Sequence, residues 1–378
     1  MSQKDPSFSI GIEEEYWVVD KVTRDLVREP PKELMEKCKD RLGSRVSHEF
    51  MQCQIEIGTS KCKGITAAAK ELAELRLILA EICAGYGLAI ISASTHPFAT
   101  WAEQKHTPRQ RYDAFAEKMQ GVVRRLLICG MHVHVGLDDD ELRNDLMGQV
   151  SYFLPHILAL TTSSPFWHGQ NTGLKSYRLS VFKELPRSGL PERFDSYGEY
   201  QRNLDIMVNA GIIQDASMVW WDVRPSVRFP TLEMRIADSC TNLKDTLCVA
   251  AFYASLLRLL YTLKRKNQRW RVYSNLLIDE NRWRAQRYGT DEGLIDLGRG
   301  EVVPYSELLE ELLGMLEEHA VALGCRDELF HARTILSRGS SAHQQVAVFD
   351  RALTAGDTRE KALCKVVDFL IDETLSGL

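Results

Sequence analysis

Five segments of the chain have the apolar and polar pattern that is typical of β-strands, and they alternate irregularly with segments of helical spacing. The strand-like segments are residues 8–19, 51–58, 88–93, 131–137 and 231–236. Helical spacing marks residues 65–82, 112–126 and most of 305–378. Because this order lacks regular β-α-β alternation, we predict an α+β fold in which helices pack on one side of a largely antiparallel sheet.

Two further segments complete this outline. Residues 247–263 are the most apolar stretch, but they include Arg258 and are short for a membrane span, so we expect a buried helix. Residues 166–238 are rich in glycine, proline and aromatic residues, and we expect long loops there that border the site. Since no Pro/Gly/Ser linker divides the chain, we predict one catalytic domain over residues 1–378, with a helical C-terminal portion.

The first strand contains three consecutive glutamates, in the sequence GIEEEYWVV. Side chains of a strand point alternately to its two faces, so Glu13 and Glu15 share one face and Glu14 lies on the other. The face of Glu14 is otherwise apolar. We therefore expect Glu14 to lie near the solvated end of the strand.

Three other strands divide in the same way into an apolar and a polar face. A solvated polar face explains any one of them. The polar positions are Gln54 and Glu56, His132 and His134, and Glu233 and Arg235. Taken with the first strand, however, these faces carry almost only side chains that bind metals: Glu13, Glu15, Glu56, His132, His134 and Glu233.

If these strands are neighbours, their carboxylates converge and repel each other unless a cation lies between them. Carboxylate oxygens with one or two imidazoles suit Mg²⁺ or Mn²⁺, and four carboxylates exceed what one ion needs, which indicates two or more ions. Arg235 shares a face with Glu233 and fits a phosphate, which arginine binds with two parallel hydrogen bonds. A simple ion pair between Glu233 and Arg235 is the alternative.

Composition narrows the class of protein. The formal net charge of −5 argues against a nucleic acid held on a broad basic surface. The first residues contain no apolar run of the signal-peptide type, and the nine cysteines form no C-x-x-C pair, which fits free thiols in a reducing cytoplasm. We expect a cytoplasmic protein without membrane or nucleic-acid partners, and a closed homodimer as the default assembly.

Seven ordered motifs resemble the bacterial carboxylate–amine ligase family, also called glutamate–cysteine ligase type 2. They run from about Ile10 to about Gln345 and read FSIGIEEEYWVVD, QIEIGTS, THPFA, GMHVHVG, WWDVRP, LEMRIAD and ENRWRAQRYG. The resemblance implies a glutamine-synthetase-like fold. In this fold a curved, mainly antiparallel sheet forms a cup that holds ATP, metal ions and an amino acid, and helices pack on its other face.

The resemblance also implies the reaction: ATP activates a carboxylate as an acyl phosphate, which an amine then attacks, giving ADP and phosphate. It implies that Glu13, Glu15, Glu56, Glu233 and one histidine bind Mg²⁺ or Mn²⁺, and that the catalytic residues are Glu233 and Arg235, with Arg235 on the transferring phosphate. His132 is the preferred histidine because it aligns better with the histidine of more distant glutamate–cysteine ligases. His134 shares its face and is the alternative.

Four further arginines are candidate ligand contacts. Arg178, in a Gly/Pro-bounded loop, and Arg224, before a proline, are expected to bind the substrate carboxylate. A solvated loop is the alternative for Arg178. Arg284 and Arg287 lie about one turn apart on a predicted helix, for which a solvated charged face is the default explanation. The resemblance makes this pair candidate nucleotide contacts.

The leading interpretation is an ATP-dependent ligase that joins the γ-carboxylate of glutamate, or of a similar amino acid, to a small amine such as cysteine. The alternatives are a ligase for another carboxylate–amine pair, a metal-dependent amide hydrolase, and a non-catalytic amino-acid or nucleotide sensor. ATP dependence separates the ligases from the hydrolase. A full set of metal ligands argues against the sensor.

Overall fold

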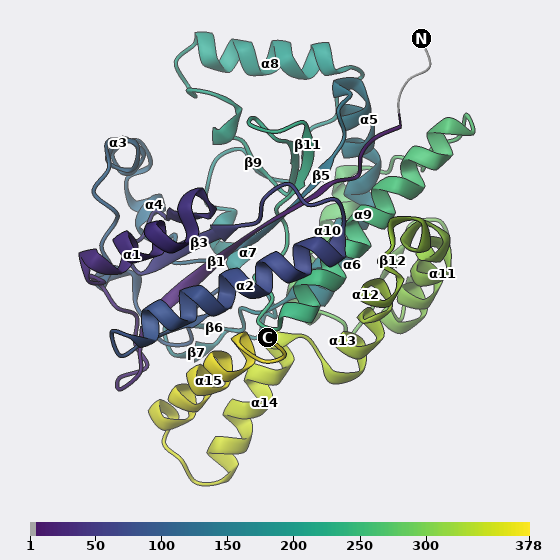
Figure 1. Cartoon of the computed structure of the whole chain (residues 1–378). Helices are drawn as coiled ribbons and strands as arrows, with labels where there is room; N and C mark the ends of the chain where they lie inside the picture. The colour runs from purple at the N-terminus through teal and green to yellow at the C-terminus, as the bar shows by residue number, and fades with distance from the viewer. Residues whose placement is uncertain (1–4) are drawn as a thin grey trace.

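The computed structural model describes residues 5–378 and contains a seven-stranded sheet (Figure 1). Its strands are β1 (Ile10–Asp20), β2 (Val46–His48), β3 (Gln54–Gly58), β4 (Leu88–Ile91), β5 (Met131–Gly136), β10 (Val223–Pro225) and β11 (Thr231–Met234). Their order is β10-β11-β5-β1-β3-β2, and β4 pairs with the last residues of β1. Every pair in this sheet is antiparallel, which confirms the predicted α+β class.

Helices and short hairpins surround the sheet. The helices are α1 (Lys32–Leu42), α2 (Ile65–Ala84), α3 (Gln110–Met119), α4 (Gly121–Arg124), α5 (Asp140–Val150), α6 (Leu154–Thr161), α7 (Arg178–Phe182), α8 (Tyr197–Asn209), α9 (Leu243–Arg265), α10 (Asn275–Tyr288), α11 (Tyr305–Leu323), α12 (Arg326–Phe330), α13 (Ala332–Arg338), α14 (Ser341–Thr354) and α15 (Arg359–Thr374). The remaining strands are β6 (Phe166–Trp167), β7 (Gln170–Asn171), β8 (Ser188–Gly189), β9 (Trp220–Trp221), β12 (Leu294–Asp296) and β13 (Glu301–Val303).

The predicted helices are largely confirmed, with two differences. The helix expected over residues 112–126 is interrupted, because Gln120 has a φ of 50° and separates α3 from α4. Residues 166–238 are not only loops: they include α7 and also α8, which projects at the top of Figure 1. Tyr200 and Leu204 lie four residues apart, are buried, and give α8 one apolar side. The glycine and proline content of the segment hid this helical spacing in the sequence.

Helices α2 and α9 cover the apolar face of the sheet. Ile12 and Tyr16 of β1, Val133 of β5 and Leu232 of β11 point to this face and are fully buried. Helix α9 is long and apolar enough by composition to cross a membrane, but most of it is buried in the interior of the protein. This confirms the expectation of a buried helix at residues 247–263.

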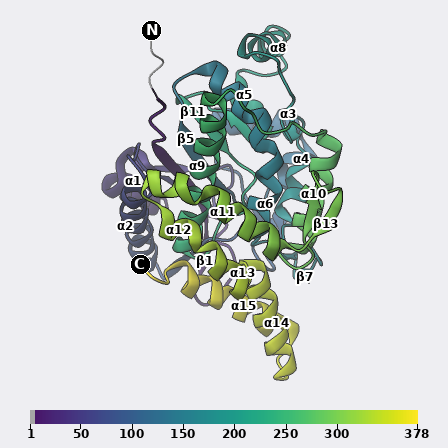
Figure 2. The ribbon, with the colours of Figure 1, turned by 90° about the vertical axis from the view of Figure 1, so that its right-hand side faces the viewer.

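A second apolar cluster covers one end of the opposite face. Trp17 and Val19 share the face of Glu13 and Glu15 on β1, yet both are fully buried in a cluster that includes residues of α14 and α15. Figure 2 shows these two helices at the lower end of the molecule. The first half of β1 is therefore the part whose polar face can line a cup.

The expectation that Glu14 lies near a solvated end of its strand is wrong. Glu14 is fully buried on the apolar face, where its carboxylate accepts hydrogen bonds from Arg76 of α2 at 2.9 and 2.6 Å. The hydroxyl of Thr246 donates to the same carboxylate at 2.6 Å, and that of Tyr16 also donates to it. A buried carboxylate is tolerated only when it is paired in this way, which a single strand's pattern does not reveal.

The remaining donors of Arg76 connect distant parts of the chain. Its guanidinium donates to the backbone carbonyls of Thr241 at 2.8 Å, Cys240 at 3.1 Å and Thr374 at 3.1 Å. The Glu14–Arg76 pair thus links β1 and α2 to the start of α9 and to the end of α15.

Replacing Arg76 with leucine should lower the free energy of unfolding by about 3–5 kcal/mol, because it leaves the buried Glu14 charge without a partner. Urea denaturation followed by tryptophan fluorescence measures this loss. Arg333→Leu is the matched control, since the Arg333 guanidinium is exposed and makes the same two-fold contact, at 2.8 and 2.6 Å, with Glu310. If Arg76→Leu were no more damaging than this control, the pair would not be a central support of the fold.

Candidate active site

The strand register brings the predicted polar faces together in the middle of the sheet. On β1, Glu13 lies opposite His132 of β5, and Glu15 lies opposite Glu56 of β3. The central strand therefore presents carboxylates to neighbours on both of its sides. This is the convergence that the alternation in the sequence predicted.

The outer strands extend the same face. Glu233 of β11 lies opposite His134 of β5 on one side and opposite Arg224 of β10 on the other. Arg235 follows β11 directly. All of these side chains line one cavity of about 840 Å³, whose size is that of a small-molecule site.

Glu13, His134 and Glu233 form the first of two groups that could hold a metal ion, with ligand atoms within 4.8 Å of one another. The Nδ1 atom of His134 bonds to the hydroxyl of Thr231 at 3.0 Å, and its Nε2 atom lies 3.5 Å from the Glu13 carboxylate without a hydrogen-bond partner among residues 5–378. His132 instead forms a hydrogen bond with Glu13 at 3.1 Å. The geometry therefore favours His134, the alternative of the two histidines, as the imidazole that faces an ion.

Glu15, Glu49 and Glu56 form the second group, also with oxygens within 4.8 Å of one another. Their other contacts are hydrogen bonds from the protein: Gly130 N–H to Glu15 at 2.7 Å, Phe50 N–H to Glu49 at 2.9 Å, and the Ser47 hydroxyl to Glu56 at 2.8 Å. Glu49 was missed from the sequence because it lies just beyond β2, a strand of three residues that is too short to show alternation.

The two groups differ in charge. Burial, and next the charge of Glu56, raise the pKa of Glu15 to about 7. Burial and the charge of Glu15 raise the pKa of Glu49 to about 7 as well, and the pKa of Glu56 is raised further for the same kind of reason. Burial would also raise the pKa of Glu233, but the charges of Arg235 and Arg224 outweigh it and lower that pKa.

The residues of both groups fit a hard divalent cation. Carboxylate oxygens dominate the donor set, one imidazole nitrogen has no hydrogen-bond partner among residues 5–378, and the three half-buried carboxylates of the second group repel each other. A cation between Glu15, Glu49 and Glu56 would remove this repulsion and restore their ordinary acidity.

For Arg235 the sequence left two roles open: an ion pair with Glu233 and a contact to phosphate. Its guanidinium forms an ion pair with Glu233 and lies 3.5 Å from Nδ1 of His132, so the simple ion pair exists. Its hydrogen bonds come from Nη1, its buried Nε atom has no partner among residues 5–378, and the side chain lines the cavity. The terminal nitrogens, rather than the buried Nε, are therefore the donors that a ligand oxygen in the cavity can meet.

Arg224 and Arg178 also line the cavity but spend most of their donors on the protein. Arg224 bonds to Glu233 at 3.0 and 3.3 Å and to two backbone carbonyls. Arg178 donates to the carbonyls of Arg235 and Ile236, both at 3.1 Å. Both arginines thus position the Glu233–Arg235 segment; direct contact of either with substrate stays a prediction.

Arg284 and Arg287 are not among the residues that line this cavity. Arg284 donates to the carbonyl of Gly293 at 3.1 Å, and Arg287 donates to that of Gly173. Their contact with a nucleotide stays a prediction. From the same helix, α10, the guanidinium of Arg282 bonds to the buried Asp222 at 2.7 and 3.3 Å. Asp222 lies between β9 and β10, directly before Val223 and Arg224 of β10.

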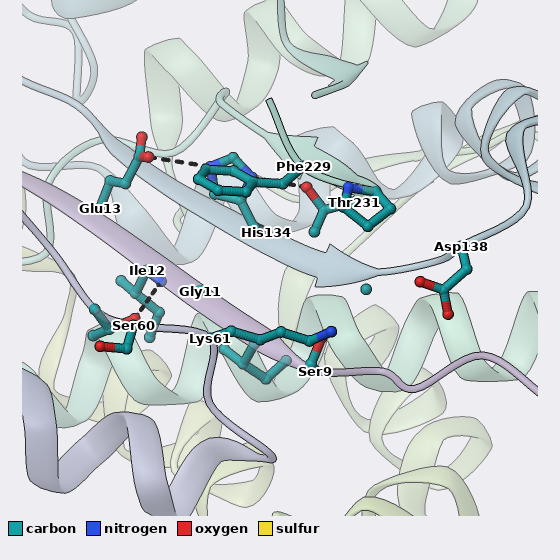
Figure 3. Close-up of a pocket in the computed structure, with 14 residues that line it drawn as sticks. Ser9, Gly11, Ile12, Glu13, Ser60, Lys61, His134, Asp138, Phe229 and Thr231 are labelled. Atoms are coloured by element: carbon teal, nitrogen blue, oxygen red, sulfur yellow. Dashed lines mark hydrogen bonds and ion pairs between the residues drawn. The ribbon is translucent and has the colours of Figure 1, made fainter. Parts of the chain in front are cut away.

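A smaller pocket of about 110 Å³ opens beside the first group, at the start of β1 (Figure 3). It shares Glu13 and His134 with the large cavity. The ring of Phe229 lies edge-on to the ring of His134, with centroids 6.0 Å apart, and Lys61 lies on the opposite side of the pocket (Figure 3). Gly11 also lines this pocket, and a Cβ at this position would lie 3.5 Å from the Cβ of His134.

Comparison with known proteins gives a consistent result. The family model described as glutamate-cysteine ligase family 2 matches residues 9–365. A protein of Rhodospirillum rubrum, provisionally named glutamate–cysteine ligase 2, is 58% identical over 99% of this chain and 97% of its own length.

Two solved structures share the fold. The bifunctional glutathione synthetase of Pasteurella multocida has a TM-score of 0.70 and 16% identity; the match covers 98% of this chain but only 53% of that one. Glutamate–cysteine ligase of Francisella tularensis, solved with AMP, has a TM-score of 0.68 and 13% identity over 97% of this chain and 89% of its own.

Adding Mg²⁺ or Mn²⁺ after chelator treatment should raise the melting temperature. The stabilisation amounts to roughly 2.7 kcal/mol at a hundredfold excess over Kd, because the ion binds only the folded state. The gain should grow from pH 6 to pH 8. Carboxylates with a pKa raised to about 7 make the metal-free protein less stable as the pH rises through that value, and the ion reverses this loss.

Differential scanning calorimetry at several pH values measures both effects. Glu49→Gln should reduce the metal-dependent gain, whereas Glu310→Gln, on the exposed surface, should leave it unchanged. A melting temperature that ignores millimolar metal at every pH would argue strongly against cation sites in the cup.

Proposed function

The chain belongs to glutamate–cysteine ligase family 2, and from this premise we propose that it joins the γ-carboxylate of glutamate, or of a similar amino acid, to an amine through an acyl phosphate. The family is one of ATP-dependent ligases, so the proposal concerns the substrates and the chemical route. ATP would donate its γ-phosphoryl group to the carboxylate. The amine would then displace phosphate, leaving ADP and an amide.

One observation carries this proposal: Arg235 lies at the first carboxylate group, in the same cavity as the second. Phosphoryl transfer collects negative charge on the oxygens of the moving group. The arrangement supplies an arginine with donor capacity beside two groups that fit divalent ions. This set suits the terminal phosphate of ATP better than it suits the single water molecule that a hydrolase must activate.

Glu13, His134 and Glu233, and likewise Glu15, Glu49 and Glu56, would hold Mg²⁺ or Mn²⁺, which would supply positive charge for the transferring phosphoryl group. The protein's own residues fix the geometry. Glu233 is held in place by Arg224 from the neighbouring strand and by Arg235. Because these contacts exist before substrate binds, little reorganisation is needed during the reaction.

The pocket beside Glu13 and His134 is the proposed place for the base of ATP. It adjoins the first group, where the phosphates would bind, and its lining includes the half-exposed aromatic ring of Phe229. An apolar cleft next to a phosphate site suits a flat aromatic base. The AMP bound by the Francisella ligase of the same fold agrees with nucleotide binding in this cup.

Two other expectations stay predictions. A cytoplasmic location agrees with the nine cysteines, which are free thiols and mostly buried. A closed homodimer rests on the general frequency of such assemblies.

Arg235→Lys and Glu233→Gln should each lower turnover by roughly a hundredfold or more, the scale for losing one charge contact to the transition state. Lysine keeps the charge of Arg235 but loses its planar pair of donors. Steady-state ADP release measures the effect, and thermal melting checks that the variants are folded. Arg333→Lys, which keeps an exposed charge, is the matched control and should behave as the parent. Near-normal turnover in a folded Arg235→Lys protein would reduce Arg235 to a structural ion pair.

The nucleotide product should be ADP, together with phosphate that contains an oxygen from the substrate carboxylate. This follows because the carboxylate oxygen attacks the γ-phosphorus and leaves with it when the amine attacks the acyl carbon. Glutamate labelled with oxygen-18 in its γ-carboxylate, followed by mass spectrometry of the released phosphate, tests this route directly. AMP and pyrophosphate as products, or amide formation without any nucleotide, would contradict the proposal.

A further inference from the structure

Four aromatic side chains form a continuous wall on the side of the cavity that faces α3 and β9. The wall consists of Phe50, Tyr112, Phe115 and Trp220, all of which line the cavity of about 840 Å³. Ring centroids lie 5.7 Å apart for Phe50 and Tyr112, 5.7 Å for Phe50 and Phe115, and 5.6 Å for Phe115 and Trp220. We call these four residues the aromatic wall.

The aromatic wall begins next to the second carboxylate group. Phe50 follows Glu49 in the chain, and its backbone N–H donates to the Glu49 carboxylate at 2.9 Å. The hydroxyl of Tyr112 donates to the carbonyl of His48 at 2.9 Å, which fixes α3 against the same loop. The aromatic wall therefore adjoins the stretch of backbone that carries Glu49, within the same cavity as the second carboxylate group.

The aromatic wall is separate from the proposed place for the base of ATP. None of its four residues lines the smaller pocket at the start of β1. That pocket adjoins the group of Glu13, His134 and Glu233, whereas the wall adjoins Glu49. The nucleotide and whatever meets the wall thus approach the centre from different sides.

We infer that the amine acceptor carries an aromatic or similarly large apolar side chain, which the aromatic wall receives. The inference rests on the proposed ligase function and specifies its second substrate. Tyr112, Phe115 and Trp220 are only partly buried, so they keep apolar surface open to the cavity. An aromatic ring packed against them removes this surface from water on both partners, and edge or offset contacts between rings add to the gain.

A side chain as small as that of cysteine would cover little of the wall. A hydrophobic pocket commonly discriminates by roughly 10- to 200-fold for each methylene group that it accommodates or misses. The nitrogen of the acceptor attacks the acyl carbon, the bond from that carbon to the phosphate oxygen breaks, and the nitrogen loses one proton. The wall takes no part in these bond changes and acts only on the choice of acceptor.

The test compares acceptors of the same acyl phosphate. Phenylalanine, phenethylamine, cysteine and hydroxylamine are supplied with ATP, Mg²⁺ and glutamate, and ADP release and the amide or hydroxamate product are measured. Hydroxylamine is small and reports acyl phosphate formation without contact to the wall. We expect kcat/KM for phenylalanine or phenethylamine to exceed that for cysteine by at least tenfold.

Variants locate the effect. Trp220→Ala should lower kcat/KM for the aromatic acceptor at least tenfold more than it lowers kcat/KM for hydroxylamine, and Trp220→Leu gives the milder change if the alanine variant unfolds. Trp283→Ala is the matched control, because Trp283 is 47% exposed on α10 and does not line the cavity. It should leave the rates with both acceptors unchanged.

The outcomes separate this inference from the function on which it rests. Hydroxamate formation combined with a preference for cysteine, or equal losses for both acceptors in Trp220→Ala, would overturn the aromatic acceptor and leave the ligase in place. Absence of hydroxamate with glutamate and with other amino-acid carboxylates would overturn the acyl phosphate route, and the aromatic acceptor with it.

Discussion

The charge on β1 is the constraint on which the rest of the structure depends. Three consecutive carboxylates point alternately to the two faces of a central strand: Glu14 is fully buried on one face, and Glu13 and Glu15 are half-buried on the other. On the apolar face, the charge of Glu14 is balanced by Arg76. The guanidinium of Arg76 also donates hydrogen bonds to backbone carbonyls just before α9 and at the end of α15. On the cup face, Glu13 belongs to one potential metal-binding group, with His134 and Glu233, and Glu15 belongs to the other, with Glu49 and Glu56. The need to balance these neighbouring negative charges thus accounts for the buried ion pair in the core and for the carboxylate groups of the site.

The two carboxylate groups in the cup differ in how far neighbouring positive charges of the protein balance their negative charge. Glu233 is held between Arg224 and Arg235, which keep it ionised and fixed in position. Glu15 and Glu49 accept hydrogen bonds from backbone N–H groups, Glu56 accepts one from Ser47, Glu49 and Glu56 also bond to each other, and the pKa values of all three rise. The charges of Arg178 and Arg235 oppose the rise in the pKa of Glu15 without reversing it, so a metal ion at these three half-buried carboxylates would supply positive charge that the protein does not fully provide. A ligase needs this combination of fixed and exchangeable positive charge at a phosphoryl group.

Much of the cup could be predicted from the sequence, because alternation along a strand fixes which side chains share a face. It brought Glu13, Glu15, Glu56, His132, His134 and Glu233 to one surface, as found. The pattern could not reveal Glu49, which follows a three-residue strand, nor the partner of Glu14, which lies 62 residues away. The roles of the arginines are harder to predict, because their long side chains reach protein carbonyls as readily as ligands. Arg178 and Arg224 contact the Glu233–Arg235 segment, and Arg284 and Arg287 are not among the described residues that line the cavity, so the contacts of all four with ligands stay predictions.

The central claim is that the two carboxylate groups are two separate cation sites. Counting bound Mn²⁺ by electron paramagnetic resonance, during titration of the chelator-treated protein at pH 8, tests it most directly. The claim predicts two ions per chain, one for each group, and the loss of one of them in Glu49→Gln while the other remains. No bound ion, or an unchanged number of ions in Glu49→Gln, would contradict it.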